Sequence, residues 1–249
     1  TRRPPDKNMM KNAIIQYDID SNKYDDPRFN NLTRSDIVKY STHSIGEYCK
    51  KYNIDHVVIT EPKLENIKHP VFERFDLILN DAWWNKYEQI LHVDSDVIVH
   101  ESVPNFFEEH SNPVSMKTAI YPKYNSSSQQ WWQANVKHSL YKKLNPADCV
   151  ERFFQTGVFG LTKHSARCLR PYIKNFRMLD SWDDGQIINW AFISSGVKHE
   201  KVSQKWNFKL RDKLVPNNKT AYFIHPAGGR KHRKDSHIQK YCRLRWPNL

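Results

Sequence analysis

The stretch EQILHVDSDVIVHES, residues 88–102, constrains the fold most because it places two aspartates inside a run that otherwise has the pattern of a buried strand. Leu91 and Val93 are side chains typical of a sheet interior. An unpaired carboxylate is costly to bury, and two neighbouring carboxylates also repel each other. We therefore expect the strand to end near Asp94, so that Asp94 and Asp96 both turn outward at its carboxyl end.

Apolar patterns before and after this stretch predict an α/β fold. Short apolar runs at residues 12–19 and 55–60 indicate strands, and helical spacing at 34–52 and 71–87 indicates helices. Strands that alternate with helices are typical of βαβ units, so we expect a mixed, mostly parallel sheet flanked by helices. Ligands of open α/β sheets bind at the carboxyl ends of the strands, where the aspartate pair is expected. Later patterns predict strands at 152–162 and 221–229 and helices at 163–175 and 181–196.

One domain is expected to span residues 12–231, because the 249-residue chain shows no internal repeat and no convincing boundary. Residues 1–11 are polar and contain proline, which predicts a linker or tail, and residues 232–249 are expected to form a basic C-terminal tail. The chain opens on TRRPPDKN without methionine, so we expect a domain excised from a longer protein or a processed product.

The four cysteines are widely spaced and contain no CxxC pair, which disfavours a zinc ribbon and leaves disulfides and buried thiols both open. Three N-x-[ST] triplets occur, but such triplets arise often by chance in a chain rich in asparagine. The cytoplasm and the secretory lumen therefore both remain possible compartments.

The net charge of +12, from 39 Lys and Arg against 27 Asp and Glu, favours an acidic partner such as nucleic acid, a membrane surface or a phosphorylated ligand. No apolar run approaches the roughly 20 residues that span a bilayer, so no membrane span is expected in this chain. A basic nucleic-acid-binding module stays as an alternative. Nucleic acid is not the expected partner, because no RRM, KH, zinc-finger or helix-turn-helix signature occurs and the basic residues are dispersed until the tail.

Two short motifs carry recognisable chemistry. Asp94 and Asp96 supply carboxylate oxygens, which hard divalent ions prefer, and a Mg²⁺ or Mn²⁺ ion bridging a diphosphate would neutralise both sets of charges. The stretch HPAGGRK, residues 225–231, combines an imidazole, glycines that permit close backbone approach and a lysine that offsets phosphate charge. The alternatives are an exposed turn for the aspartate pair and a core histidine for His225.

Both motifs resemble those of glycosyltransferases of the GT-A fold. Residues 85–108 are similar to the segment around the aspartate pair of that fold, and the pattern H-x-x-G-x-x-K at 225–231 resembles the retaining transferases of glycosyltransferase family 8, the glycogenin and bacterial galactosyltransferase group. FQTGVFGL at 154–161 and SQKWNF at 203–208 resemble two further segments of that family. The resemblance implies a single-domain GT-A fold that transfers a sugar from a nucleotide diphosphate, UDP, to an acceptor hydroxyl of a glycan or glycoconjugate.

The resemblance also implies roles for individual residues. Asp94, Asp96 and His225 would bind Mn²⁺ or Mg²⁺. The donor would be bound by residues at the end of the first strand, by the aspartate motif and by the two glycine-containing motifs: Ile15, Gln16, Tyr17, Asp94, Ser95, Gly157, Gly228 and Lys231. The family's usual upstream lysine or arginine has no exact counterpart, and Arg74 and Lys86 are the candidates at shifted spacing.

Retention of the anomeric configuration follows from the resemblance alone. Asp184 is the candidate polar group near the anomeric carbon and Gln155 the next, although Asp184 would also suit a helix cap. The chain departs from the family pattern at Gly185, where glutamine is usual, and at Gln155, where asparagine is commoner. An inverting GT-A transferase remains a further alternative and would require a general-base carboxylate. Trp131 and Trp132 are candidates either for stacking on an acceptor sugar or for packing.

Overall fold

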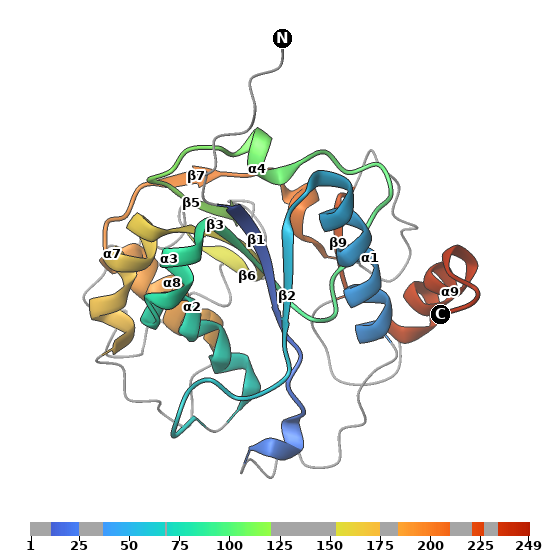
Figure 1. Cartoon of the computed structure of the whole chain (residues 1–249), viewed down its shortest axis with the longest axis horizontal. Helices are drawn as coiled ribbons and strands as arrows, with labels where there is room; N and C mark the ends of the chain where they lie inside the picture. The colour runs from blue at the N-terminus through green and yellow to red at the C-terminus, as the bar shows by residue number, and fades with distance from the viewer. Residues whose placement is uncertain are drawn as a thin grey trace.

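The computed structural model describes residues 11–24, 37–67, 69–120, 153–174, 184–209, 221–226 and 234–249, and the structural statements below refer to these residues. A six-stranded sheet with strand order β2-β1-β3-β6-β5-β7 forms the centre of the molecule (Figure 1). Its strands are β1 Lys11–Tyr17, β2 Asp55–Ile59, β3 Tyr87–Val93, β5 Met116–Ile120, β6 Phe154–Thr162 and β7 His199–Lys201. Only β6 runs antiparallel to its neighbours, so the sheet is mixed and mostly parallel, as the sequence predicts.

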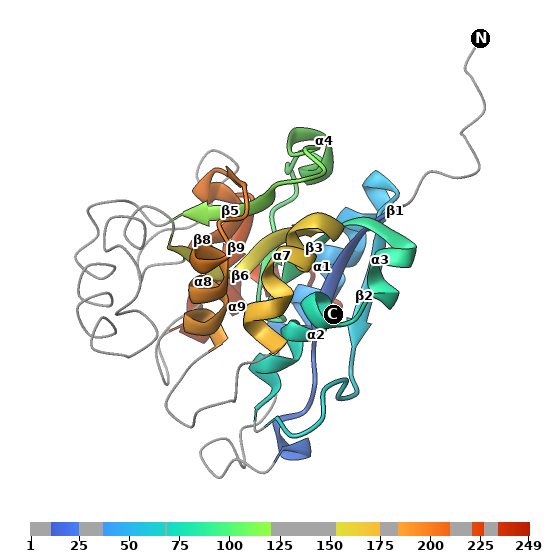
Figure 2. The same cartoon turned by 90° about the vertical axis from the view of Figure 1, so that its left-hand side faces the viewer.

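Helices cover both faces of this sheet (Figures 1 and 2). Successive residues of β1 point to opposite faces, because side chains alternate along a strand. Ala13 and Ile15 belong to the core cluster that includes α2, α7 and α8, whereas Ile14 belongs to the cluster that includes α1. The helices are α1 Ile37–Tyr52, α2 Asp76–Leu79, α3 Ala82–Lys86, α4 Phe106–Glu109, α7 Lys163–Lys174, α8 Asp184–Ser194 and α9 Lys234–Arg245, with 3₁₀ turns η1 Ser21–Lys23, η2 Pro70–Phe75 and η4 Gln204–Asn207.

A second, three-stranded sheet has the order β4-β9-β8, with β4 at Ile98–Val99, β8 at Phe208–Lys209 and β9 at Phe223–His225. β4 follows the aspartate pair directly, and β9 runs antiparallel to it with Ile224 opposite Ile98. This register carries the end of β9 back toward Asp96. The small sheet therefore brings a late segment of the chain to the end of β3.

The single helix predicted at residues 71–87 is wrong, because this stretch forms η2, α2 and α3 and then enters β3 at Tyr87. Asn80 has an extended backbone at the end of α2, and its side-chain oxygen accepts a hydrogen bond from the backbone nitrogen of Ala82 at 3.0 Å. Side chains such as asparagine compete with helical backbone bonds in this way, which an apolar stripe does not reveal.

Regular structure occurs within both segments that the sequence predicts to lie outside the domain, the linker at 1–11 and the tail at 232–249. Lys11, expected in the linker, is the first residue of β1. Within residues 232–249, expected to be a tail, α9 packs Ile238 and Cys242 into a core cluster shared with α1, β4 and β9.

Cys49, Cys168 and Cys242 are free thiols. In the described part of the chain, no helix is long and apolar enough to cross a membrane.

Candidate active site

The three predicted metal ligands lie together in the structure. Asp94 and Asp96 follow β3, and His225 ends β9. One ligand atom from each residue lies within 4.8 Å of those from the other two. The Nε2 atom of His225 is 3.4 Å from Asp96 Oδ1 and 3.6 Å from Asp94 Oδ2. Two sheets are needed for this arrangement, since each supplies part of the cluster.

Asn207 orients the imidazole of His225. Its side-chain nitrogen donates to the carbonyl of Gln155 at 3.3 Å, so its oxygen is the atom that faces His225 Nδ1 at 2.8 Å. His225 Nδ1 must then be the donor, which leaves Nε2 as the nitrogen directed at the two carboxylates. Lone pairs from an imidazole and two carboxylates converge in this way around a divalent cation, with a second polar group fixing the tautomer. The donor set therefore fits a metal ion.

Gly157 allows the cluster to close. It lies on β6 beside the end of β3, and its carbonyl accepts a hydrogen bond from the backbone nitrogen of Asp94 at 2.8 Å. A Cβ atom at this position would lie 2.8 Å from Asp94 Oδ2 and closer still to the ring of His225. The sequence predicts Gly157 as a donor-binding residue, and the structure shows that any side chain there would collide with two candidate metal ligands.

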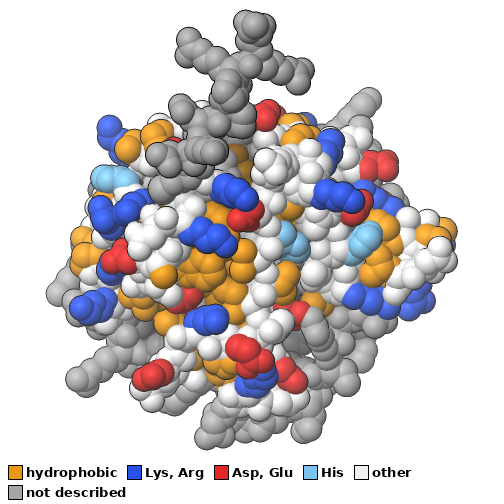
Figure 3. Space-filling model, viewed as in Figure 1, with side chains coloured by type: hydrophobic (Ala, Val, Ile, Leu, Met, Phe, Trp, Pro, Cys, Tyr) orange, Lys and Arg blue, Asp and Glu red, His pale blue; other side chains and the backbone are white. Residues whose placement is uncertain are grey.

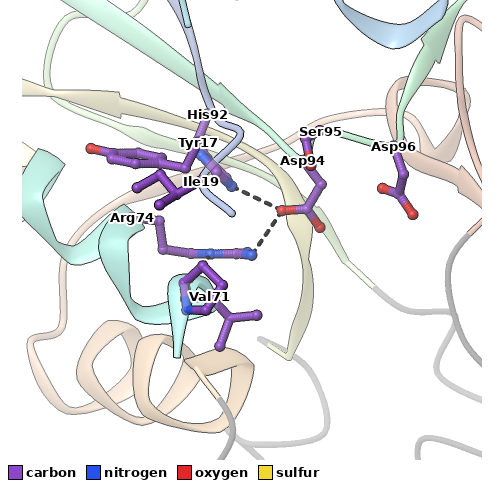
Figure 4. Close-up of a pocket in the computed structure, with 9 residues that line it drawn as sticks. Tyr17, Ile19, Val71, Arg74, His92, Asp94, Ser95 and Asp96 are labelled. Atoms are coloured by element: carbon purple, nitrogen blue, oxygen red, sulfur yellow. Dashed lines mark hydrogen bonds and ion pairs between the residues drawn. The ribbon is translucent and has the colours of Figure 1, made fainter. Parts of the chain in front are cut away.

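Arg74, on η2, joins Asp94 to Asp184 at the start of α8, and Figure 4 shows its contact with Asp94. Its guanidinium lies 2.8 Å from Asp94 Oδ1 and 3.1 Å from Asp184 Oδ2, and it also donates to the carbonyl of Thr156 at 2.9 Å. Burial would raise the pKa of Asp94, but Arg74 and then His92 hold it well below its usual range. Asp94 is therefore ionised at neutral pH.

The carboxyl of Asp96 is in a different electrostatic environment. Partial burial raises its pKa, and the neighbouring charge of Asp94 adds to this effect, whereas His225 opposes it. No arginine lies within ion-pair distance of Asp96 among the described residues, and its side chain keeps 39% exposure. Asp96 is thus the member of the pair whose charge most needs a cation.

His92 is a part of the site that sequence reasoning missed. It lies on β3, and its Nε2 atom is 3.1 Å from Asp94 Oδ1. Burial first, and the nearby Arg74 second, lower the pKa of His92 to about 4, so the ring is neutral at pH 7. A histidine within the apolar run ILHV is the signal that could have drawn attention to it.

A pocket of ≈ 200 Å³ adjoins the cluster at the carboxyl ends of β1 and β3 (Figure 4). The predicted donor-binding residues Tyr17, Arg74, Asp94 and Ser95 contribute to its wall. Tyr17 is half-buried, and its hydroxyl lies 3.4 Å from Asp76 Oδ2. The complete wall consists of Tyr17, Ile19, Pro70, Val71, Arg74, His92, Asp94, Ser95 and Asp96.

Two other residues predicted to bind the donor do not line this pocket. Ile15 is fully buried in the core cluster, so its side chain has no access to a ligand. Gln16 is also fully buried, and its amide nitrogen lies 3.0 Å from Ser41 Oγ and 3.2 Å from the carbonyl of Asp94. The side chain of Ile15 packs in the core and that of Gln16 supports the backbone of Asp94, so the role predicted for these two residues at the donor stays a prediction.

Both predicted catalytic residues lie near Arg74 or the cluster. Asp184 begins α8 and is held by Arg74, with 9% of its surface exposed. Gln155 lies on β6, and its carbonyl receives the hydrogen bond from Asn207. The side-chain oxygen of Gln155 is buried without a hydrogen-bond partner among the described residues. Gly228, Lys231, Trp131 and Trp132 lie outside the described residues.

Comparison with known proteins identifies the fold. No protein-family model and no curated protein matches the chain. A glycosyltransferase involved in the glycosylation of the major capsid of PBCV-1 matches with a TM-score of 0.56 and 15% identity, over 92% of this chain and 99% of that chain. The bifunctional glycosyltransferase WbbM matches with a TM-score of 0.55 and 12% identity, over 92% of this chain and 48% of that chain. The chain therefore has the GT-A-like α/β fold of these glycosyltransferases.

Proposed function

We propose that this chain is a metal-dependent glycosyltransferase that moves a sugar from a nucleotide-sugar donor, a UDP-sugar, to an acceptor hydroxyl of a glycan or glycoconjugate. The observation that carries the proposal is the convergence of Asp94, Asp96 and His225 beside a pocket at the carboxyl ends of β1 and β3. Ligands of open α/β sheets bind at that end of the strands. The fold shared with known glycosyltransferases supports the same reaction class.

Asp94, Asp96 and His225 would hold the cation. One imidazole and two carboxylates suit Mn²⁺ better than Mg²⁺, which prefers a shell of oxygen ligands. When bound, the ion would act as a Lewis acid that stabilises charge on the departing diphosphate. Arg74 keeps Asp94 ionised, and Asn207 keeps His225 Nε2 directed at the space beside the two carboxylates where the cation would bind.

The pocket would hold the nucleoside part of the donor. Tyr17 offers a flat ring on which a base could stack, and Ser95 offers a hydroxyl beside the aspartates. Gly228 and Lys231 belong to the proposal as contacts to the diphosphate, on the strength of their motif. In the proposed complex, the nucleoside of the donor therefore lies at Tyr17, the diphosphate lies at the cation and the sugar points toward Asp184.

We assign the polar group nearest the anomeric carbon to Asp184, with Gln155 as the second candidate. Arg74 supports the first assignment because it joins Asp184 to Asp94 within one ion-paired unit. The second is supported by the unpartnered side-chain oxygen of Gln155, which a sugar hydroxyl could satisfy. Both assignments assume that the transfer retains the anomeric configuration of the sugar.

A panel of nucleotide sugars tests this proposal. Purified protein with Mn²⁺ is incubated with each sugar, and NMR identifies the anomer that is first released by hydrolysis. We expect release from a UDP-sugar with retained configuration, lost on chelation of the metal and in Asp96→Asn, while Leu244→Asp on the exposed side of α9 serves as control. Release of the inverted anomer would assign the inverting mechanism instead.

The same preparation distinguishes the nucleic-acid alternative. On the face shown in Figure 3, Lys and Arg side chains are scattered among apolar ones over several elements, which does not favour a single track for a phosphate backbone. Absence of hydrolysis with every nucleotide sugar, together with a steeply salt-dependent affinity for DNA or RNA, would contradict the transferase proposal.

A further inference from the structure

His92 is a buried polar residue with only one hydrogen-bonded atom. It is 1% exposed, and its ring lies between those of Phe159 and Tyr17, with centroid distances of 4.9 and 6.1 Å. Nε2 faces Asp94, whereas Nδ1 is buried without a hydrogen-bond partner among the described residues. A buried polar atom without a partner destabilises a fold, so a phenylalanine would suit this aromatic environment better. Packing alone therefore does not explain the imidazole.

The geometry determines which nitrogen carries the proton. A carboxylate can only accept hydrogen bonds, so the nitrogen 3.1 Å from Asp94 Oδ1 must be the donor. His92 thus has its proton on Nε2 and a bare lone pair on Nδ1. The opposite tautomer would set a lone pair against an anionic oxygen.

The donors of His92 and Arg74 converge on a single oxygen of Asp94. Oδ1 lies 2.8 Å from the guanidinium of Arg74 and 3.1 Å from His92 Nε2 (Figure 4). The other oxygen, Oδ2, faces His225 Nε2 at 3.6 Å. Two donors from different elements, η2 and β3, fix the rotation of the carboxylate, which is otherwise a soft torsion. Asp94 is therefore held with one oxygen occupied and one directed at the cluster.

We propose that His92 is a positioning residue that holds Asp94 so that only Oδ2 is presented to a divalent cation. This inference rests on the proposed function, because it assumes that Asp94, Asp96 and His225 form the cation site. The inference predicts that replacing His92 lowers metal affinity without lowering the stability of the fold. Removal of the imidazole removes the unpartnered Nδ1 and also releases Asp94, so one substitution should leave the fold intact or more stable while weakening the site.

Mn²⁺ alone, titrated by calorimetry into the purified full chain, is the test, with a thermal melt of each protein in chelator. His92→Phe keeps the ring shape and loses the donor, and we expect its affinity for Mn²⁺ to fall by roughly 10–100-fold, as is usual when a supporting partner of a metal ligand is lost. Its melting temperature without metal should equal or exceed that of the wild type. His92→Gln restores an amide donor near the position of Nε2 and should recover most of the affinity.

Asp96→Asn separates a failure of this inference from a failure of the proposed function. If Asp96→Asn loses Mn²⁺ binding but His92→Phe binds as tightly as the wild type, His92 does not position Asp94 and the inference alone is overturned. A parallel loss of melting temperature and affinity in His92→Phe that His92→Gln does not restore would make His92 purely structural, which also overturns it. If Asp96→Asn binds Mn²⁺ like the wild type, the cation site itself is absent and both proposals fail.

Discussion

At the scale of single residues, the site depends on a missing side chain as much as on those that are present. Gly157 gives Asp94 and His225 the space in which to approach each other, since a Cβ atom would lie 2.8 Å from Asp94 Oδ2. Its carbonyl also fixes the backbone of Asp94 just after β3 ends. Gly157 thus acts on Asp94 twice, through a hydrogen bond to its backbone and through the space left for its carboxylate.

Gly157→Ala should therefore weaken the cation site. The added methyl group must displace the ring of His225 or the carboxylate of Asp94, so we expect Mn²⁺ affinity to fall by roughly 10–100-fold, the range observed when ligand support is lost. Gly46→Ala in α1 is the control, because its Cβ would have no neighbour closer than 3.6 Å. That control should bind Mn²⁺ normally and gain about 0.5–1 kcal/mol in the free energy of unfolding. Wild-type Mn²⁺ affinity in Gly157→Ala would contradict this account of the cluster.

At the scale of elements, two connections place the ends of helices around the site. η2 supplies Arg74 to the aspartate pair, and the preceding Glu73 accepts hydrogen bonds from Tyr24 and from the backbone of Lys63 and Leu64. α8 is tied to β6 by Asn189, whose amide bonds both backbone groups of Phe154 and the carbonyl of Gly185. These bonds fix the end of α8 that carries Asp184.

Asn189→Ala should separate α8 from β6. The substitution leaves the buried backbone nitrogen and oxygen of Phe154 without this partner, so we expect a loss of about 3 kcal/mol in the free energy of unfolding. Asn105→Ala removes a cap at the start of α4 and provides the same chemical change in a more exposed position, where about 1 kcal/mol is expected. Urea denaturation measures both, and equal losses would show that Asn189 acts only as an ordinary local contact.

The sequence predicts the elements of this site better than their contacts. Asp94 and His225 could be identified because each lies in a short local motif with recognisable chemistry. The pairing of Arg74 with Asp184 joins two segments that are distant in the chain, and no local pattern encodes it. The orientation of His92 was likewise invisible, since it depends on which face of β3 packs beside η2.

At the scale of the whole molecule, the small sheet and α9 form a second layer of support behind the site. α9 inserts Ile238 and Cys242 beside Ile98 and Ile224, the residues that pair β4 with β9. Because this pairing carries His225 to Asp96, the C-terminal helix stabilises the small sheet on which one ligand depends. The charge of residues 232–249 predicted a tail there, since basic side chains dominate the composition and conceal the few buried positions.

Ile238→Asp should destabilise the protein through this cluster. Ile238 is 1% exposed, and an unpaired carboxylate in its place should cost about 3 kcal/mol or more in the free energy of unfolding. Leu244→Asp in the same helix is the matched control, because Leu244 is 75% exposed and a surface change there should stay within about 0.5 kcal/mol. Chemical denaturation measures the free energy of unfolding of both variants. A small loss in Ile238→Asp, similar to that in Leu244→Asp, would mean that α9 does not pack as described.

The central claim is that Asp94, Asp96 and His225 together hold a divalent cation. An anomalous difference map from crystals of the protein grown with Mn²⁺ and UDP tests it most directly. We predict one strong peak at a coordination distance of about 2 Å from Asp94 Oδ2, an oxygen of Asp96 and Nε2 of His225, with the nucleotide in the adjoining pocket. A map with UDP bound but no peak among these three residues, or with the peak elsewhere, would contradict the account.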